Sequence, residues 1–233
     1  MRLRIAFIAA ALAATLGVTA VASGSQSALN INPAGFSARI DNPWFPLEPG
    51  TTYHYIGIKD GQPSRDIVVV THQTRMIQGV PCVAVQDVLY VRGKLHERTT
   101  DWYSQDKQGN VWYYGEKTAE FDRSGHVAST EGTWLAGVNE AQPGIYMPAH
   151  PRVGQTGRQE YYKGHAEDHY RVAALISTVT SGAESTLLTE ETTPLEPGVL
   201  DNKLYVRGVG TVMELTVKGG SERNQLVSVT RGA

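Results

Sequence analysis

The sequence predicts a mainly β protein in which one strongly curved antiparallel sheet forms a half-barrel or open barrel, with few or no helices. Long runs are rich in Val, Thr, Tyr and Trp, which fit a pleated, half-buried surface. Aromatic side chains on both faces of the run at 112–114 require a sheet that is covered on both sides or wraps around its core. The runs are separated by glycine-centred turns: KDGQ (59–62), IQGV (77–80), VRGK (91–94), KQGN (107–110), RSGH (123–126) and KGGS (218–221).

Residues 1–22 have the three-part pattern of a secretory signal peptide. Arg2 and Arg4 precede an apolar run at 5–18, and small residues at 20–22 mark a cleavage site. The apolar run is too short to span a membrane comfortably, and no later run reaches the length that spanning needs. We therefore expect an exported protein, secreted or periplasmic, without stable insertion into a membrane.

Beyond the signal peptide we expect a flexible N-terminal segment over 23–40 and a single β-rich domain over 41–233. Cys82 is the only cysteine, so no internal disulfide stabilises the fold, and its surroundings PCVAVQDV indicate a buried strand residue. Without Arg2 and Arg4, 19 basic side chains remain against 23 acidic ones, a formal charge of −4. This balance argues against nucleic acid and anionic membrane surfaces as partners.

The expected strands follow the turns along the chain. In the first strand Tyr53 and Tyr55 alternate with His54 and Ile56, as in a sheet with one solvated face. Segment 135–150 contains several glycine and proline breakers, and we expect it to be a long irregular connection across the mouth of the sheet. The strands are 51–59, 65–76, 82–91, 95–105, 110–116, 119–122, 126–134, 157–164, 167–180, 185–192, 202–207, 211–217 and 223–230.

The pentapeptide PLEPG occurs twice, at 46–50 and at 194–198. A second repeated stretch, LYVRG at 89–93 and 204–208, follows the two copies at unequal distances, which argues against a tandem duplication. Proline fixes φ and restricts the residue before it, and glycine permits a tight entry into the next strand. PLEPG is therefore best explained as one turn that the chain uses twice.

Several longer segments carry a family resemblance: NPWFPLEPGTTYHY, DWYSQDKQGNVWYYGE, AQPGIYMPAHPRVG, RQEYYKGHAED and TPLEPGVLDNKLYVRGVG. With them the chain resembles a widespread group of exported bacterial β-rich proteins known as domains of unknown function, over nearly the whole mature chain. The resemblance implies motif positions but no activity. In outline the expected fold also resembles bacterial lipoprotein carriers, an analogy of architecture alone. The implied motif positions are Asp101, Tyr103, Asp106, Gly109, Asn110, Gly115, Glu116, Pro143, Gly144, Pro148, Glu160, Tyr161, Gly164, Glu167 and Asp168.

The stretch QEYYKGHAEDHY (159–170) contains ligand types suited to zinc or iron. On a strand His165, Glu167 and His169 share one face, but residues four apart lie about 13 Å from each other, so all three cannot hold one ion. In the family pattern both histidines also fall on variable positions. A strand with solvated charges explains the stretch more simply, and we predict neither a metal nor another cofactor.

Carboxylates offer a second kind of chemistry. Glu160, Glu167 and Asp168 are the candidate catalytic residues, since carboxylates gathered in a cleft can share a proton or hold calcium. Asp101, Asp106 and Glu116 would join them if distant strands meet, although DKQGN at 106–110 is explained by a hairpin tip. The sequence contains no G-x-S-x-G nucleophile motif.

Aromatic side chains support the leading functional hypothesis, an exported non-catalytic binding or carrier domain that holds a small apolar ligand inside the curved sheet. A core rich in Tyr and Trp would account for the same side chains. Two other hypotheses stay open: an exported enzyme that uses the carboxylates for acid–base or metal-assisted chemistry, and a structural envelope protein without a ligand. The candidate ligand contacts are Tyr55, Trp102, Tyr103, Trp112, Tyr114 and Tyr161.

Overall fold

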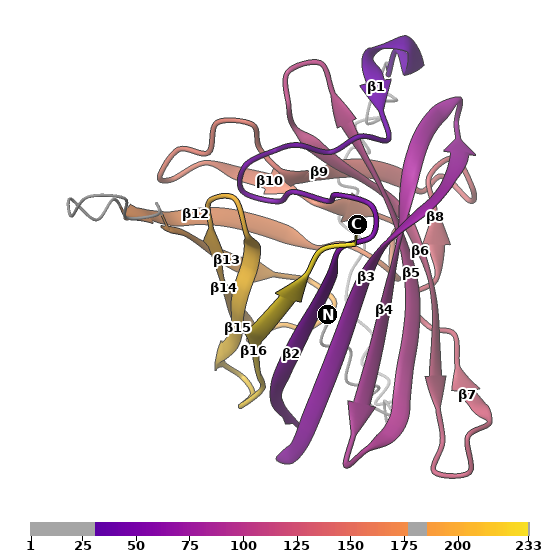
Figure 1. Ribbon diagram of the computed structural model, residues 1–233, viewed down its shortest axis with the longest axis vertical. Helices are drawn as coiled ribbons and strands as arrows, with labels where there is room; N and C mark the ends of the chain where they lie inside the picture. Colours follow the sequence, from indigo (N-terminus) through magenta and orange to yellow (C-terminus); the bar gives the residue numbers. More distant parts are fainter. Residues whose placement is uncertain (1–30, 177–185, 233) are drawn as a thin grey trace, which may run out of the picture. The chain divides into compact units, whose positions relative to one another are not determined.

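The computed structural model describes residues 31–176 and 186–232 (Figure 1). The predicted signal peptide, residues 23–30 of the predicted flexible segment and residues 177–180 of the predicted strand 167–180 lie outside these ranges. The described residues are almost entirely β, apart from one 3₁₀ turn, η1 (Pro33–Gly35). In these ranges no helix has the length and the apolar character needed to cross a membrane.

Thirteen strands follow one another through a single antiparallel sheet, in the order β10-β12-β13-β14-β15-β16-β2-β3-β4-β5-β6-β9-β11. Three short strands pair beside this path, β1 on β5 and both β7 and β8 on β6. The strands are β1 (Phe36–Ser37), β2 (Thr52–Lys59), β3 (Gln62–Ile77), β4 (Val80–Val91), β5 (Lys94–Asp106), β6 (Val111–Phe121), β7 (Val127–Ser129), β8 (Trp134–Leu135), β9 (Gln142–Met147), β10 (Thr156–Arg158), β11 (Glu160–Tyr161), β12 (His169–Ile176), β13 (Thr186–Thr192), β14 (Leu200–Val206), β15 (Gly210–Lys218) and β16 (Arg223–Thr230).

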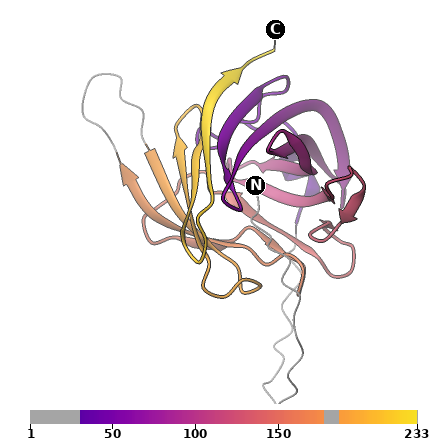
Figure 2. The ribbon, with the colours of Figure 1, turned by 90° about the horizontal axis from the view of Figure 1, so that it is seen from below.

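The two ends of this sheet meet in one short stretch of chain. β10 pairs with β12, β11 pairs with β9, and only Gln159 separates β10 from β11. The sheet therefore curls almost into a closed barrel with one unsealed seam, and Figure 2 shows the strands arranged around its interior. The predicted fold class, a strongly curved antiparallel sheet that forms an open barrel, is confirmed.

Some predicted element boundaries are wrong. The strands expected at 110–116 and 119–122 form one strand, β6, while the strand expected at 157–164 divides into β10 and β11 because the chain changes pairing partner there. Segment 135–150 is not irregular throughout, since it contains β9, which pairs with β6. Gly144 in β9 lies so near the end of β10 that an added Cβ would be 2.3 Å from the Arg158 carbonyl oxygen, so this glycine permits close approach of two strands.

A bulge in β6 decides which side chains beyond Tyr113 face the interior of the sheet. Gly115 has a φ of +144°, and an added Cβ there would be 2.6 Å from the Trp134 carbonyl oxygen. The register of β5 and β6 shifts at this point, so Tyr114 has no direct partner on β5. The extra residue brings Tyr113 and Glu116, three residues apart, to the same face. Trp112 and Tyr114, two residues apart, share the other face as the sequence predicts, and both pack on the Phe36 ring at centroid distances of 5.8 and 5.9 Å. Tyr113 lies on the opposite face.

The inner face of the barrel, called the lumen below, carries an unusual number of polar side chains. Register partners share a face, so the row Tyr55, Asp66, Leu89 and Glu97 points into the lumen. Tyr55 is 7% exposed and Asp66 1%, whereas Ile56 on the outer face is 53% exposed. The polar residues of the lumen are Tyr55, Asp66, Asp87, Glu97, Thr99, Asp101, Tyr103, Tyr113, Glu116, Thr118, Thr189, Glu191, Lys203, Tyr205, Glu214 and Asn224.

One buried ion pair links the lumen to the seam. The Lys203 ammonium lies 2.7 Å from Glu191 and 3.7 Å from Glu214, and the side chains of Lys203 and Glu191 are only 7% and 10% exposed. Burial lowers the pKa of Lys203, but the carboxylates of Glu191 and Glu214 outweigh it and hold that pKa well above its usual range. Glu191 also accepts hydrogen bonds from Gln159 (3.3 Å) and Tyr205 (3.3 Å). The pair therefore fastens β13 and β14 to the chain segment at the seam.

We expect Lys203→Met to lower the free energy of unfolding by about 3–5 kcal/mol, because it leaves Glu191 buried without its counter-charge. Urea unfolding of the exported protein measures this loss. Arg171→Met is the matched control, since the ion pair of Arg171 with Glu190 lies on the surface, with Arg171 49% exposed. The control should change stability by about 0–1 kcal/mol. Equal losses in the two variants would contradict a special role for the buried pair.

Candidate functional site

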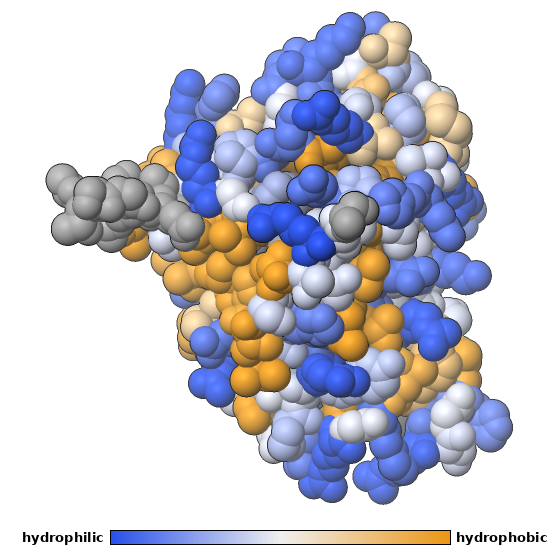
Figure 3. Space-filling model, in the orientation of Figure 1, coloured by the Kyte–Doolittle hydropathy of each residue, from blue (hydrophilic) through white to orange (hydrophobic). Residues whose placement is uncertain are grey.

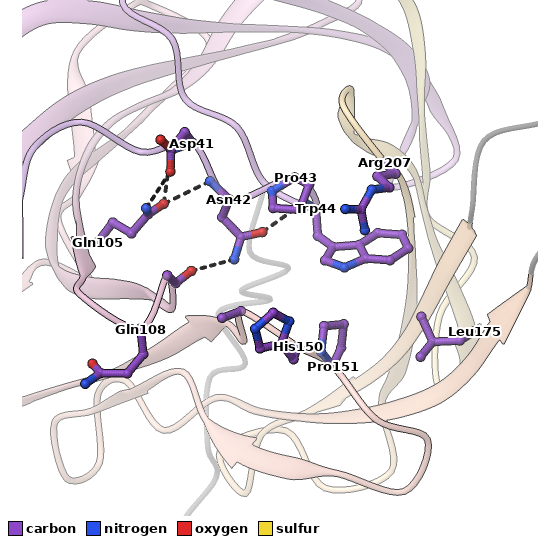
Figure 4. Close-up of a pocket in the computed structure, with 12 residues that line it drawn as sticks. Asp41, Asn42, Pro43, Trp44, Gln105, Gln108, His150, Pro151, Leu175 and Arg207 are labelled. Carbon is purple, nitrogen blue, oxygen red and sulfur yellow. Dashed lines mark hydrogen bonds between the residues drawn. The ribbon is translucent and has the colours of Figure 1, made fainter. Parts of the chain in front are cut away.

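A cavity of about 490 Å³ opens at one end of the curved sheet. The NPW segment (42–44), two turns and the chain that follows β9 converge there. Figure 4 shows its lining, with Arg207 beside Trp44, His150 and Pro151 below the indole, and Leu175 to one side. This cavity is called the mouth pocket below. Its lining residues are Asp41, Asn42, Pro43, Trp44, Gln105, Gln108, Gly109, Ala149, His150, Pro151, Leu175 and Arg207.

Asn42 and Gln105 fix the wall of the mouth pocket. Asn42 is buried, and its side-chain amide donates to the carbonyl oxygens of Gly109 (2.8 Å) and Pro148 (3.1 Å). Its side-chain oxygen accepts from the backbone N–H of Trp44 (2.8 Å). The Gln105 side-chain oxygen accepts from the backbone N–H groups of Asp41 and Asn42 at 3.0 and 2.9 Å. Figure 4 shows these bonds as a continuous chain. Hydrogen bonds within the protein therefore hold this wall in place without a ligand.

The mouth pocket combines apolar surface with one exposed cation. Pro43, Trp44, Pro151 and Leu175 supply the apolar part, and Leu175 is 39% exposed. The Arg207 guanidinium lies 5.8 Å from the Trp44 ring, and the turn that carries it is fixed by a 2.6 Å hydrogen bond from Gly208 N–H to the Pro43 carbonyl oxygen. Within residues 31–176 and 186–232, no carboxylate forms an ion pair with Arg207.

Phe45 separates the mouth pocket from the lumen. Its ring lies 4.7 Å from that of Tyr146 and 5.4 Å from that of Tyr103, both centroid distances. Tyr103 stacks on Tyr113 at 4.8 Å, and Tyr146 lies 5.8 Å below the Lys203 ammonium. Adjacent residues therefore serve the two spaces: Trp44 lines the mouth pocket, and Phe45 covers the lumen.

Below this aromatic layer the lumen holds several carboxyl groups. Asp101 and Glu116 are register partners on β5 and β6, and the Tyr113 hydroxyl donates to both, at 3.2 Å to Glu116. Glu97 lies further down the same face and accepts from the Thr99 hydroxyl at 3.2 Å. Burial, with smaller contributions from the charges of Asp87 and Glu116, raises the pKa of Glu97 to about 7.

Asp66 and Asp87 form a second acidic pair in the lumen, close enough for the charge of Asp66 to raise the pKa of Asp87. Burial raises the pKa of Asp66, and burial together with the charge of Asp66 raises that of Asp87 well above its usual range. The Asn224 amide donates to Asp66 at 3.0 Å. These groups make the lower lumen a polar interior, which is costly for an apolar ligand to enter.

The six aromatic residues expected to contact a ligand do not share one surface. Tyr55 and Tyr103 point into the lumen, where the Tyr55 hydroxyl donates to the Thr211 carbonyl oxygen at 3.0 Å. Trp112 and Tyr114 lie on the other face with Phe36, and the Trp112 indole N–H donates to Asp106 at 2.8 Å. Their assignment as ligand contacts stays a prediction.

The remaining two aromatic candidates lie under arginine side chains. The Arg75 guanidinium is 4.6 Å from the Trp102 ring, and the Arg158 guanidinium is 4.2 Å from the Tyr161 ring. Trp102 is buried and Tyr161 is half-buried. Both contacts are cation–π interactions within the fold, so neither ring faces the mouth pocket.

The candidate catalytic carboxylates also lie in different settings. Glu160 is fully buried in β11, whereas Glu167 accepts from the Gly164 N–H at 2.7 Å and closes a tight turn. The backbone oxygen of Asp168 accepts from the Gln159 N–H at 2.8 Å. Their catalytic role stays a prediction. Asp106 has the predicted hairpin-tip geometry, since it accepts from the backbone N–H groups of Gln108 and Asn110, both at 2.9 Å.

The two histidines of the considered metal set bind different partners. His165 lies 3.1 Å from Glu131 and stacks on Tyr162 at 4.4 Å, while His169 contacts the Glu167 backbone oxygen at 2.9 Å. Over the part of the chain that the structure describes, no three His, Cys, Asp or Glu side chains gather in a geometry suited to a metal ion.

Cys82 is fully buried, as expected for a strand cysteine. Burial raises the pKa of its thiol to about 12. A thiol with this pKa is not a thiolate near neutral pH and is therefore a poor nucleophile.

Sequence reasoning missed Asn42, Gln105 and Arg207 at the mouth pocket, because residues far apart in the chain meet there. It named Asp101 and Glu116 among the candidate carboxylates but missed the lumen acids Asp66, Asp87 and Glu97, although one signal was present. In strand 82–91 the residues Val83, Val85 and Leu89 alternate on one face, and Asp87 interrupts that apolar face. A carboxylate in an otherwise apolar row indicates a buried titratable group.

Comparison with known proteins adds fold-level similarity only. No family model matches the sequence, and no curated protein matches it. Two solved structures are similar, each over 81% of this chain and 99% of the other chain. One is a "putative exported protein with YmcC-like fold" from Bacteroides fragilis, at 13% identity and a TM-score of 0.44. The other is a "putative lipoprotein" from Parabacteroides distasonis, at 11% identity and a TM-score of 0.41.

The lumen acids predict that the protein is more stable in mild acid than at neutral pH. The pKa of Glu97 is about 7 in the folded protein, above its ordinary unfolded value, so folding is favoured when this group is protonated. The stabilisation is complete below about pH 4.5 and is lost as the pH rises to about 7, by up to about 3 kcal/mol. Urea unfolding across this pH range measures it.

Glu97→Gln tests the assignment, because glutamine keeps the shape and does not titrate. The variant should flatten the decline in stability over this pH range, whereas Glu140→Gln, at an exposed turn, should leave the wild-type slope unchanged. A slope in Glu97→Gln equal to that of the wild type would show that Glu97 is not responsible.

Proposed function

We propose that the protein is an exported, non-catalytic binding domain that holds a small ligand in the mouth pocket, and that this ligand has an apolar body and one anionic group. The mouth pocket carries the proposal. Its volume of about 490 Å³ lies in the range of small-molecule sites. Export rests on the signal peptide predicted for residues 1–22.

The chemistry of the lining supports the ligand class. Leu175, Pro151 and Pro43 offer apolar contact, and Arg207 offers a planar donor for a carboxylate, sulfonate or phosphate. His150 lies on the opposite side of the pocket from Arg207 in Figure 4 and supplies a second nitrogen donor. The Asp41 carboxylate accepts from the Gln105 amide at 2.7 Å, so it is already engaged in the wall.

The ligand binds at the mouth and not deeper in the curved sheet. An apolar ligand in the lumen would separate carboxyl groups such as Asp66 and Glu97 from their hydrogen-bond partners, at a cost of about 1–3 kcal/mol for each buried group. Phe45 and the tyrosines beneath it already fill the passage between the two spaces. The proposal therefore moves the expected apolar ligand from the interior of the sheet to its open end.

Calorimetric titration with decanoate, a carboxylate on an apolar chain, tests the proposal, with its methyl ester as the uncharged partner. We expect Arg207→Met to weaken decanoate binding about tenfold or more and to change ester binding little, because only the acid can accept a charge-assisted hydrogen bond. Leu175→Asp should weaken the binding of both compounds.

Arg123→Met is the control for a general loss of positive charge, since Arg123 is exposed on a hairpin tip away from the mouth pocket. It should leave decanoate binding unchanged. Native mass spectrometry of the exported protein then identifies the natural ligand. If the Arg207 and Leu175 variants bind decanoate as the wild type does, the mouth pocket is not the site.

A further inference from the structure

A second surface of the protein is apolar and lies away from the mouth pocket. On the outer face of β13–β16 and β2, apolar side chains lie on neighbouring strands, and Figure 3 shows hydrophobic residues gathered over this part of the molecule. Three of them are strongly exposed: Ile56 at 53%, Val217 at 46% and Val227 at 52%. We call this set the outer strip. It consists of Ile56, Leu188, Leu204, Met213, Leu215, Val217 and Val227.

The sheet register makes the outer strip continuous. Leu188, Leu204 and Met213 are successive register partners across β13, β14 and β15, so they form one row on the outer face. Gln225 carries this row to Ile56 on β2. Leu215 lies two residues from Met213 and begins the adjacent row. Side chains in one row of neighbouring strands are near neighbours, so the strip presents one surface.

The charged side chains at the outer strip are mainly basic. The row that contains Ile56 continues to Arg65 on β3, and the row that contains Leu215 continues to Arg223 on β16. Lys218 follows Val217, and all three basic side chains are exposed. The acidic side chain in these rows is Glu190, whose carboxylate is bonded to Arg171 at 2.5 Å. The described rows therefore carry local positive charge on a chain that is acidic overall.

We propose that the outer strip docks the protein on an anionic lipid surface. Apolar side chains rimmed by Lys and Arg match the interface of a bilayer, where acyl chains lie beneath anionic headgroups. The three basic side chains select this partner over an uncharged or an acidic apolar surface. The expectation that anionic membrane surfaces are poor partners was drawn from the net charge of the whole chain and not from this local charge. The attachment is peripheral, so nothing in it requires a membrane-spanning segment.

The outer strip and the mouth pocket are formed by different residues. Register places the outer strip on β13–β16 and β2, on the outer face, while the mouth pocket lies at the end of the sheet and is lined from the NPW segment, two turns and β12. No residue of the outer strip lines the mouth pocket. Docking on lipid and binding of a small ligand therefore use separate residues and can be tested separately.

Co-sedimentation with lipid vesicles tests the proposal, using vesicles of phosphatidylcholine alone and vesicles with equal amounts of phosphatidylcholine and phosphatidylglycerol. We expect the exported protein to bind the anionic vesicles and to dissociate as salt is raised, because the basic side chains are then screened. Ile56→Glu with Val227→Glu should weaken binding about tenfold or more. Val127→Glu is the matched control, 56% exposed on β7, and should bind as the wild type does.

Circular dichroism confirms that the variants fold, and Arg223→Glu alone provides a test that leaves the apolar side chains in place. Failure of the wild type to bind anionic vesicles would overturn the proposal, and so would an equal loss of binding in Val127→Glu. If ultracentrifugation shows a dimer that Ile56→Glu dissociates while vesicles are ignored, the occupant is a second copy of the chain and the lipid proposal is wrong.

Discussion

The architecture depends on closure of one antiparallel ladder at Gln159. The chain pairs with β12 before this residue and with β9 after it, so a stretch of six residues connects the two ends of a thirteen-strand sheet. Gln159 is buried, and its side chain bonds Glu191, which in turn holds Lys203. Closure gives the sheet an inner and an outer face. The polar lumen and the apolar outer strip differ because different side chains lie on these two faces.

The lumen contains ionisable side chains, which are uncommon in a protein interior. They need hydrogen-bond partners or counter-charges within the protein. One part is neutralised by Lys203, while burial raises the pKa values of Asp66 and Glu97 and so favours their neutral forms more than in an exposed carboxyl group. Tyr146 contacts both the Lys203 ammonium and the Phe45 ring. The charged interior and the wall of the mouth pocket are therefore in contact through Tyr146 and Phe45. A ligand at the mouth does not need to enter the lumen.

Local pattern predicted the strands well because glycine turns and β-branched runs act over a few residues. It failed at 135–150, where β9 pairs with β6 despite the breakers Pro143 and Gly144. It also missed the bulge at Gly115, which brings Tyr113 and Glu116, three residues apart, to the lumen face. The separation of Trp112 and Tyr114 from Tyr113 follows from the alternation of side chains along a strand, and the sequence predicted it. The candidate site was less predictable than the fold, because Asn42, Gln105 and Arg207 meet only after closure.

The sequence by itself determined the fold class, the order of most strands and the hairpin built around Asp106, because these depend on residue spacing and turn chemistry. Only the tertiary structure decided where the sheet closes, which polar side chains became internal and which residues surround the mouth pocket. The physical reason is register: a strand fixes the alternation of its own side chains, but its neighbours decide which of its two faces is buried.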